Sequence, residues 1–271
     1  MITMPDDMLQ RLKQKEIEVL KAVHSICQKY NLNYFLVGGT LIGAVRHQGF
    51  IPWDDDIDIA MMRKDYDHFQ EIAQKELGDK YFLQTWQTDR WHGPFMKIRV
   101  NGTLFQDADT PANAKYHKGV FIDIFPLDNV LKPDGMEFKV RAKIVRLLNL
   151  LLYRKCGAGL HVKSRVKYRM GVALSRLFPK SFMIRLRHKL MTRDNTIDTA
   201  YVTSFGSGYH AQKQLFRRDV YLPATELEFE KEKFSVPGRY DLVLRQIFGD
   251  YMKLPPEEER IPKHGLQKYD F

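Results

Sequence analysis

The chain has 271 residues, of which 44% are hydrophobic and 12% aromatic, enough apolar side chain to bury a globular core; this excludes a disordered or fibrous chain. Its two cysteines, Cys27 and Cys156, lie far apart without Cys or His at zinc-ligand spacing, so we expect neither a disulfide framework nor a structural zinc, and a reducing compartment. The sequence opens without a basic-then-apolar leader and holds no run of 18 apolar residues, which predicts a soluble or peripheral protein, most simply a cytoplasmic one.

The net charge of +10 is unevenly distributed along the chain. Between Lys139 and Arg193 there are 16 Lys and Arg and no Asp or Glu, whereas the rest of the chain has 27 basic against 33 acidic residues. The sequence therefore predicts a mildly acidic body with one strongly basic section.

Periodicity and turn residues predict the elements in chain order. The first 77 residues contain three clear patterns: apolar residues at helical spacing, an apolar run that ends in two glycines, and an alternating acidic stretch. The expected elements are a helix at 6–30 with Asp6 or Asp7 as its N-cap, a strand at 34–37, a helix at 40–46, a strand at 54–61 and a helix at 64–77. Strand-rich sequence follows (YFLQTW, FMKIRV, VFIDIFPL), then helical basic sequence from about 133 to 193, then a mixed remainder.

This order favours an α+β protein. We expect a catalytic core at 1–130, a basic helical region at 131–200 packed on it, and a C-terminal segment at 201–271 that completes the same unit.

Three aspartates alternate in the strand predicted at 54–61. Because successive strand residues point to opposite faces, Asp54, Asp56 and Asp58 would share one face while the intervening isoleucines point into the core. Carboxylates so close together need a positive partner, and Mg²⁺ suits them because it prefers carboxylate oxygens and substrate phosphates. The plainer alternative is an exposed acidic turn in which Asp58 caps a helix.

Gly38, Gly39 and Thr40 lie at the predicted strand-to-helix junction upstream of these acids. Two glycines let the backbone approach a ligand closely, and free N–H groups at a helix start attract phosphate oxygens. Alone, the pair would indicate only a tight turn. Followed by the acidic strand, it predicts half of a phosphate-and-metal site.

Asp123 stands between large apolar residues in another predicted strand. A buried carboxylate without a partner costs several kcal/mol. A protonated or hydrogen-bonded buried acid is one explanation, and a position beside Asp56 and Asp58 on a neighbouring strand is a better one. The three carboxylates would then hold a cation for phosphoryl or nucleotidyl transfer.

The run YFLVGGTLIGAVRHQGFIPWDDDIDIAM at 34–61 closely resembles the signature of the LicD family of phosphocholine transferases, which is similar to the fukutin-related proteins and belongs to the nucleotidyltransferase superfamily. FMKIRV at 95–100, GVFIDIFPLD at 119–128 and GDYMKLPPEEERIPKH at 249–264 extend the match toward both ends. The resemblance implies a nucleotidyltransferase-like mixed sheet flanked by helices. It also implies a Mg²⁺-dependent transfer of phosphocholine from CDP-choline to a sugar hydroxyl of a surface glycan precursor, of teichoic acid or lipopolysaccharide type.

The resemblance also implies roles for the acids. Asp56 and Asp58 match the paired metal ligands, Asp123 matches the third carboxylate, and residues 38–40 match the phosphate-holding turn. Asp54 matches an acid found in many members and would be an auxiliary ligand or a neighbour of one. By its position, Asp123 is also a candidate to accept the proton of the attacking hydroxyl.

Several other side chains are weaker candidates for substrate contacts. Arg46 and His47 follow the glycine turn, and Lys97 and Arg99 share one face of their predicted strand, so each pair could neutralise phosphate. The alternatives are a surface pair of Arg46 with an aspartate and a solvated face for Lys97 and Arg99. A choline headgroup would need aromatic walls. The candidate rings are Trp53, Trp86, Trp91 and Tyr81.

The basic section at 139–193 alternates Lys and Arg with apolar residues, as in KVRAKIVRLLNLLLYRK. This pattern favours a surface on anionic lipid at the inner membrane face, or one that faces a polyanionic acceptor; a helical lobe with solvated charges is the alternative. Nucleic acid is not expected, because no recognised binding module accompanies the charge.

Two other functions stay open at this level. One is a nucleotidyltransferase or another alcohol-phosphate transferase of the same superfamily. The other is a non-enzymatic membrane or polyanion adaptor, against which the intact Asp56, Asp58 and Asp123 argue.

Overall fold

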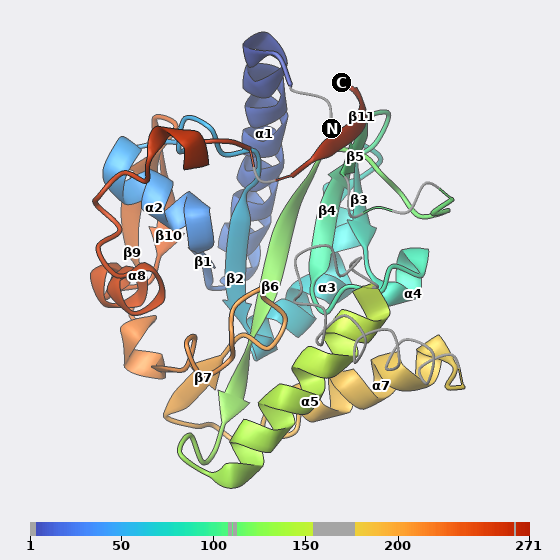
Figure 1. Ribbon diagram of the computed structural model, residues 1–271, viewed down its shortest axis with the longest axis vertical. Coiled ribbons are helices and arrows are strands. Elements are labelled where there is room, and N and C mark those ends of the chain that lie inside the picture. Colours follow the sequence, from blue (N-terminus) through green and yellow to red (C-terminus); the bar gives the residue numbers. More distant parts are fainter. Residues whose placement is uncertain (1–3, 108–109, 111–112, 154–176, 263) are drawn as a thin grey trace.

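The centre of the computed structural model, which describes residues 4–107, 110, 113–153, 177–262 and 264–271, is a curled mixed sheet (Figure 1). Its strand order is β1-β2-β6-β4-β3, and the short β7 and β8 continue from β6. The strands are β1 (Tyr34–Leu36), β2 (Asp58–Met62), β3 (Tyr81–Gln84), β4 (Met96–Val100), β6 (Phe121–Val130), β7 (Tyr201–Thr203) and β8 (Phe216–Arg217). In this sheet β2 and β6 run parallel, and the other described neighbours are antiparallel. The expectation of an α+β fold is confirmed.

Two long helices, α1 (Asp6–Tyr30) and α3 (Arg63–Leu77), pack against each other and against the sheet. Both are amphipathic, and their apolar side chains enter the core at helical spacing. The cap predicted for α1 was wrong. Pro5 is the N-cap residue, and Asp6 and Asp7 lie inside the first turn, where their charges favour the helix dipole.

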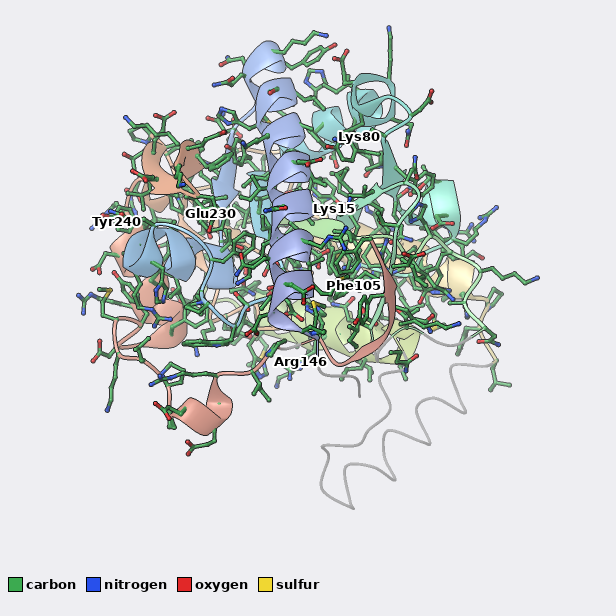
Figure 2. The ribbon with its side chains drawn as sticks, turned by 90° about the horizontal axis from the view of Figure 1, so that it is seen from above. Lys15, Lys80, Phe105, Arg146, Glu230 and Tyr240 are labelled. Carbon is green, nitrogen blue, oxygen red and sulfur yellow. The ribbon has the colours of Figure 1, made fainter. Side chains whose placement is uncertain are left out.

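A second group of elements lies on the β1 side of the sheet. It consists of α2 (Gly38–His47), the hairpin of β9 (Thr225–Phe229) and β10 (Glu232–Val236), and α8 (Tyr240–Phe248). On the other side, β5 (Leu104–Asp107) pairs with the C-terminal β11 (Leu266–Asp270). Figure 2 shows α1 running across the molecule between β11, near Phe105, and the lobe that carries Glu230. One apolar core takes side chains from Leu9 through to Leu266, so sequence from both ends builds it.

The basic region forms α5 (Met136–Tyr153) and α7 (Lys180–Met191), which pack against each other and cross the lower end of the sheet in Figure 1. The rest of the predicted helical stretch, 154–176, lies outside the described residues, as does Cys156. No helix in the described part of the chain is long and apolar enough to cross a bilayer. Three short helices complete the fold: α4 (Trp86–Asp89), η1 (Arg218–Val220) and η2 (Glu257–Glu259).

The acidic strand begins four residues later than predicted. Residues 54–57 have irregular backbone, and β2 starts at Asp58. The reason lies in its neighbour: β1 ends at Leu36 because α2 begins at Gly38, so β2 has no antiparallel partner upstream of Ile59. The strict alternation of Asp54, Asp56 and Asp58 on one strand face is therefore wrong, and the two glycines stand in the first turn of α2 rather than before it.

Candidate active site

Two of the predicted acids meet across the parallel pair of strands. The register places Asp58 of β2 directly opposite Asp123 of β6, and Lys97 of β4 opposite Asp123 on its other side. Register partners project to the same face of a sheet, so the three side chains line up across adjacent strands. Lys97 Nζ lies 2.6 Å from Asp123 Oδ1, and both side chains are buried.

The surroundings of Asp58 are strongly negative. Burial, and then the charges of Asp56, Asp123 and Asp54, raise the pKa of Asp58 well above its ordinary value. An ionised carboxylate is stable in such a place only when a cation supplies the missing positive charge. These oxygen donors are of the type that Mg²⁺ prefers, so the residues present fit a divalent cation.

The glycine turn packs directly on the acids. Gly38 has a φ of +60°, and a Cβ there would lie 2.9 Å from Asp58 Oδ2; a Cβ on Gly39 would overlap the Asp54 carboxylate. Thr40 Oγ1 accepts a 2.8 Å hydrogen bond from the backbone N–H of Asp58. No side chain caps the N-terminus of α2, so its first N–H groups can meet an anion.

His264 and Asp55 belong to the same cluster, although sequence reasoning missed both. The backbone N–H of His264 donates to Asp55 Oδ2 at 3.3 Å, and its ring Nδ1 lies 3.2 Å from Asp55 Oδ1. Burial alone would lower the pKa of His264, but the hydrogen bond to Asp55 and the charges of Asp56 and Asp55 raise it to about 9. Ligand atoms of Asp55, Asp56 and His264 all lie within 4.8 Å of one another. The only sequence signal for His264 was its place in the closing motif.

Behind the acidic loop, α1 contributes two charged side chains. Lys13 Nζ donates to the carbonyls of Ile51 and Pro52, at 3.3 and 2.8 Å, and so fixes the backbone just before Asp54. Glu16 is 2% exposed, and burial together with the charges of residues 54–56 raises its pKa well above the ordinary value. These contacts tie the acids to the helix that covers the sheet.

The predicted basic residues have definite partners. Arg46 Nη1 donates to the carbonyl of Tyr251 at 2.8 Å and its Nε to His47 at 2.9 Å. Arg99 is buried and bonds Gln84 and the Gly119 carbonyl, both at 2.6 Å. Lys97 and Arg99 are both buried, so the alternative of a solvated face for this pair is wrong.

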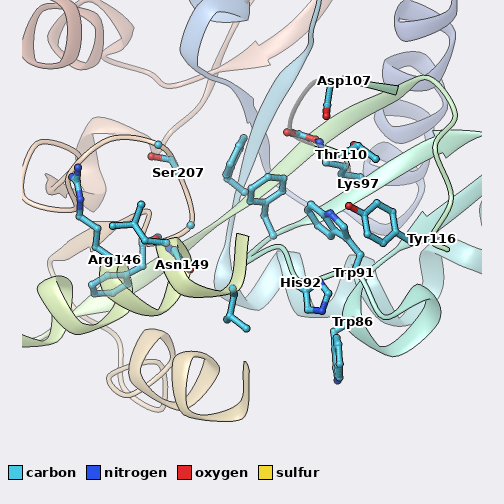
Figure 3. A pocket seen from close by; sticks show the side chains of 18 of the residues that line it. Trp86, Trp91, His92, Lys97, Asp107, Thr110, Tyr116, Arg146, Asn149 and Ser207 are labelled. Carbon is cyan, nitrogen blue, oxygen red and sulfur yellow. The ribbon is translucent and has the colours of Figure 1, made fainter. Parts of the chain in front are cut away.

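A cavity of about 1250 Å³ opens beside the cluster, and Asp123, Lys97 and His264 form part of its wall (Figure 3). Its aromatic lining includes two of the predicted rings, Trp86 and Trp91. The remaining described aromatic side chains in the lining are Phe95, Tyr116, Phe125, Phe205 and Tyr209. These rings make a wall suited to an apolar or cationic group.

The other two predicted rings do not line this cavity. Trp53 lies under the guanidinium of Arg260, 5.7 Å from ring to charge, and Tyr81 is buried in the core. Within the cavity the ammonium of Lys97 already lies 3.4 Å from the centroid of Phe121 and 5.5 Å from that of Trp91, so the aromatic wall tolerates a cation.

The glycine turn, Asp58 and Asp123 thus lie together on adjacent elements. A family model described as LicD/FKTN/FKRP, nucleotidyltransferase domain, matches residues 31–140. The chain is 31% identical over 267 residues to the lipopolysaccharide cholinephosphotransferase LicD of Haemophilus influenzae, covering 93% of this chain and 94% of that protein. It is 33% identical over 61 residues to the ribitol 5-phosphate transferase FKRP of Homo sapiens, covering 22% of this chain and 12% of that protein.

The chain therefore belongs to the LicD family, and the resemblance stated from the sequence is confirmed. Its membership makes it a phosphotransferase.

Proposed function

We propose that this protein transfers phosphocholine from CDP-choline to a sugar hydroxyl of a cell-surface glycan precursor, of teichoic acid or lipopolysaccharide type, and does so with Mg²⁺. The observation that carries the proposal is the register of Asp58 and Asp123 on parallel strands at the wall of an aromatic cavity. The name and the near-complete coverage of the Haemophilus influenzae relative support choline as the alcohol. Since cytidine nucleotides are cytoplasmic substrates, we place the reaction in the cytoplasm, at the inner membrane face where the acceptor is lipid-linked.

The acids and the glycine turn would bind different parts of the donor. Asp56, Asp58 and Asp123 would hold the cation, with Asp54 as an auxiliary ligand, and the cation would neutralise diphosphate charge and polarise the phosphorus. The N–H groups of residues 38–40 would bind phosphate oxygens at the start of α2. Lys97, 2.6 Å from Asp123, would hold that carboxylate in place and offer its ammonium to the phosphates.

Asp123 would also accept the proton of the attacking hydroxyl. It is the one acid of the three that lines the cavity, where an acceptor would enter. Asp123→Asn should lower the single-turnover rate much more than it lowers Mg²⁺ affinity. Equal losses of both would assign Asp123 to metal binding alone.

The experiment that tests the proposal follows two labels. CDP-choline labelled in the choline, and separately in the cytidine, is incubated with Mg²⁺ and a saccharide acceptor. Transfer of the choline label alone supports phosphocholine transfer, and transfer of the cytidine label would indicate a nucleotidyltransferase instead.

Ribitol phosphate is the second candidate donor group, since the chain matches FKRP over 61 residues and the family model that matches residues 31–140 also includes FKRP. The aromatic lining favours choline, because a quaternary ammonium binds ring faces and a polyol needs hydrogen-bond partners. Trp91→Leu should raise KM for CDP-choline roughly tenfold, the value of a cation–π contact of about 1–2 kcal/mol, and leave any use of CDP-ribitol unchanged. Preferential transfer from CDP-ribitol by the parent protein would replace choline with ribitol.

A further inference from the structure

Helix α5 carries an apolar stripe that faces solvent. Met136, Val140, Ile144 and Leu147 are 73, 46, 40 and 53% exposed. At 100° per residue they fall on one side of the helix. Helices at a protein surface normally have one apolar side, and the opposite side of α5 is already buried in the clusters that α5 and α7 share. The stripe is therefore a second apolar side, and packing within the described fold does not account for it.

Basic side chains run along the edge of this stripe. Lys139, Lys143 and Arg146 each precede a stripe residue, and the structure gives them no ion pair or hydrogen bond within the described residues. The single acid on α5, Glu137, is engaged by Arg193 at 2.6 Å and lies 3.5 Å from Arg141. The solvent side of α5 is thus half apolar and half cationic, without neutralising acids.

The same helix borders the candidate active site. Lys143, Arg146 and Leu150 line the cavity that contains Asp123, and Figure 3 shows Arg146 and Asn149 projecting from α5 at one end of it. A surface that covered the stripe would lie next to the mouth through which an acceptor enters.

We propose that the solvent side of α5 docks on an anionic lipid bilayer. The stripe enters the headgroup boundary, and Lys139, Lys143 and Arg146 lie among lipid phosphates. The positive charge along α5 favours lipid over a second copy of the chain as the partner of this face. A second copy of the chain, pairing by the same face, would bring like charges together, whereas phosphate headgroups complement them. Leu177 and Phe178, just before α7, and Phe182, in its first turn, are 75, 52 and 45% exposed and add apolar surface beside the helix that packs on α5.

The inference rests on the proposed function only for its purpose, which is to bring a lipid-linked acceptor to the cavity. Docking itself is measured without turnover, so the docking proposal and the proposed function are tested separately. Transfer to a soluble saccharide should be equal for the parent protein and for the stripe variant Val140→Ser, Ile144→Ser, Leu147→Ser, whose three positions do not line the cavity.

Co-sedimentation of the purified full chain with vesicles tests the docking. We expect binding to vesicles of phosphatidylcholine with phosphatidylglycerol, at least tenfold weaker binding to phosphatidylcholine alone, and weakening of the anionic binding as salt is raised. The triple variant Val140→Ser, Ile144→Ser, Leu147→Ser should bind the anionic vesicles at least tenfold more weakly. Lys139→Gln with Lys143→Gln should weaken binding to anionic vesicles and not to neutral ones.

A matched control lies elsewhere on the surface. Met252, Leu254 and Ile261 are 52, 43 and 63% exposed in the C-terminal segment, and their replacement by Ser should leave vesicle binding unchanged. Equal binding of the parent and the stripe variant would overturn the proposal. So would a dimer in sedimentation velocity that the stripe substitutions dissociate while vesicles are not bound.

A single substitution keeps the proposal testable where the triple variant does not fold. Leu147→Trp preserves an apolar side chain and reports its own environment. Its emission should shift to shorter wavelength with anionic vesicles, relative to the parent protein treated alike. An unchanged difference spectrum contradicts insertion of the stripe.

Discussion

Single hydrogen bonds and close contacts hold the acids of this site in position. The backbone N–H of Asp58 donates its hydrogen bond to a side chain, the hydroxyl of Thr40 on the neighbouring helix, because the strand of Asp58 has just begun and no strand neighbour reaches that N–H. Asp123 is held by the ammonium of Lys97. Both contacts join residues of different elements, so each can be removed without changing an acid.

Thr40→Val tests the first contact. The change keeps the shape of the side chain and removes the acceptor, which leaves the Asp58 N–H without its partner and should lower the free energy of unfolding by about 1–3 kcal/mol. Thr40→Ser retains the hydroxyl and should stay near the parent value. Urea unfolding gives both values, and an equal loss in the two variants would show that the methyl group matters and the hydrogen bond does not.

Lys97→Met tests the second contact. It leaves Asp123 buried beside Asp58 without a positive partner, so we expect a loss of about 3 kcal/mol of folding free energy in the absence of divalent cations, partly restored by saturating Mg²⁺. Lys80 offers a control, because its pair with Glu18 is more than half exposed and Lys80→Met should barely change stability. A loss of folding free energy that Mg²⁺ does not restore would show that Lys97 and the cation do not stabilise the same carboxylate.

At the scale of elements, the pairing of β11 with β5 brings the end of the chain to the acidic loop. His264 lies just before β11 and reaches Asp55, which is 1% exposed. Residues that orient the ligands of a cation typically account for ten- to hundredfold in affinity or rate. The last strand thus brings His264 to an acidic cluster whose other members belong to the first 130 residues.

His264→Ala in the full chain should therefore slow transfer about tenfold or more and weaken Mg²⁺ binding, while β11 stays paired. Lys268→Ala, on the exposed side of the same strand, should behave as the parent protein. Initial rates over a Mg²⁺ titration make the comparison, and a parent-like curve for His264→Ala would remove the residue from the site.

For the molecule as a whole, the convergence of acids predicts that cation binding stabilises the folded chain. A ligand that binds only the native state, present at 100 times its Kd, adds about 2.7 kcal/mol of stability. For a chain of this size that corresponds to a rise in Tm of about 5–10 °C. Mg²⁺ should produce such a rise in the parent protein and EDTA should reverse it.

Asp56→Asn and Asp58→Asn should each abolish most of that shift in thermal denaturation, because each removes a charged oxygen donor. Asp67→Asn is a suitable control, since Asp67 is paired with Arg63 on α3. The same Mg²⁺ shift in all four proteins would place the cation elsewhere.

Local pattern was sufficient for much of the architecture. The limits of α1 and α3 follow from apolar spacing, and the glycines before an acidic strand indicated the family and the face on which Asp58 and Asp123 meet. The alternating pattern wrongly predicted a strand at residues 54–57. A strand extends only as far as its neighbours do, and the sequence of β2 does not show where β1 ends.

The sequence by itself determined the helices α1, α2 and α3, the strands β1, β3, β4 and β6 and the membership of the LicD family, since these depend on residues near one another or on a contiguous motif. Tertiary structure alone decided that Asp55 meets His264, that Lys97 pairs with Asp123, and that Trp86 and Trp91 rather than Trp53 and Tyr81 line the cavity. Those contacts join residues brought together by sheet register and by the docking of distant segments, and no local spacing records them.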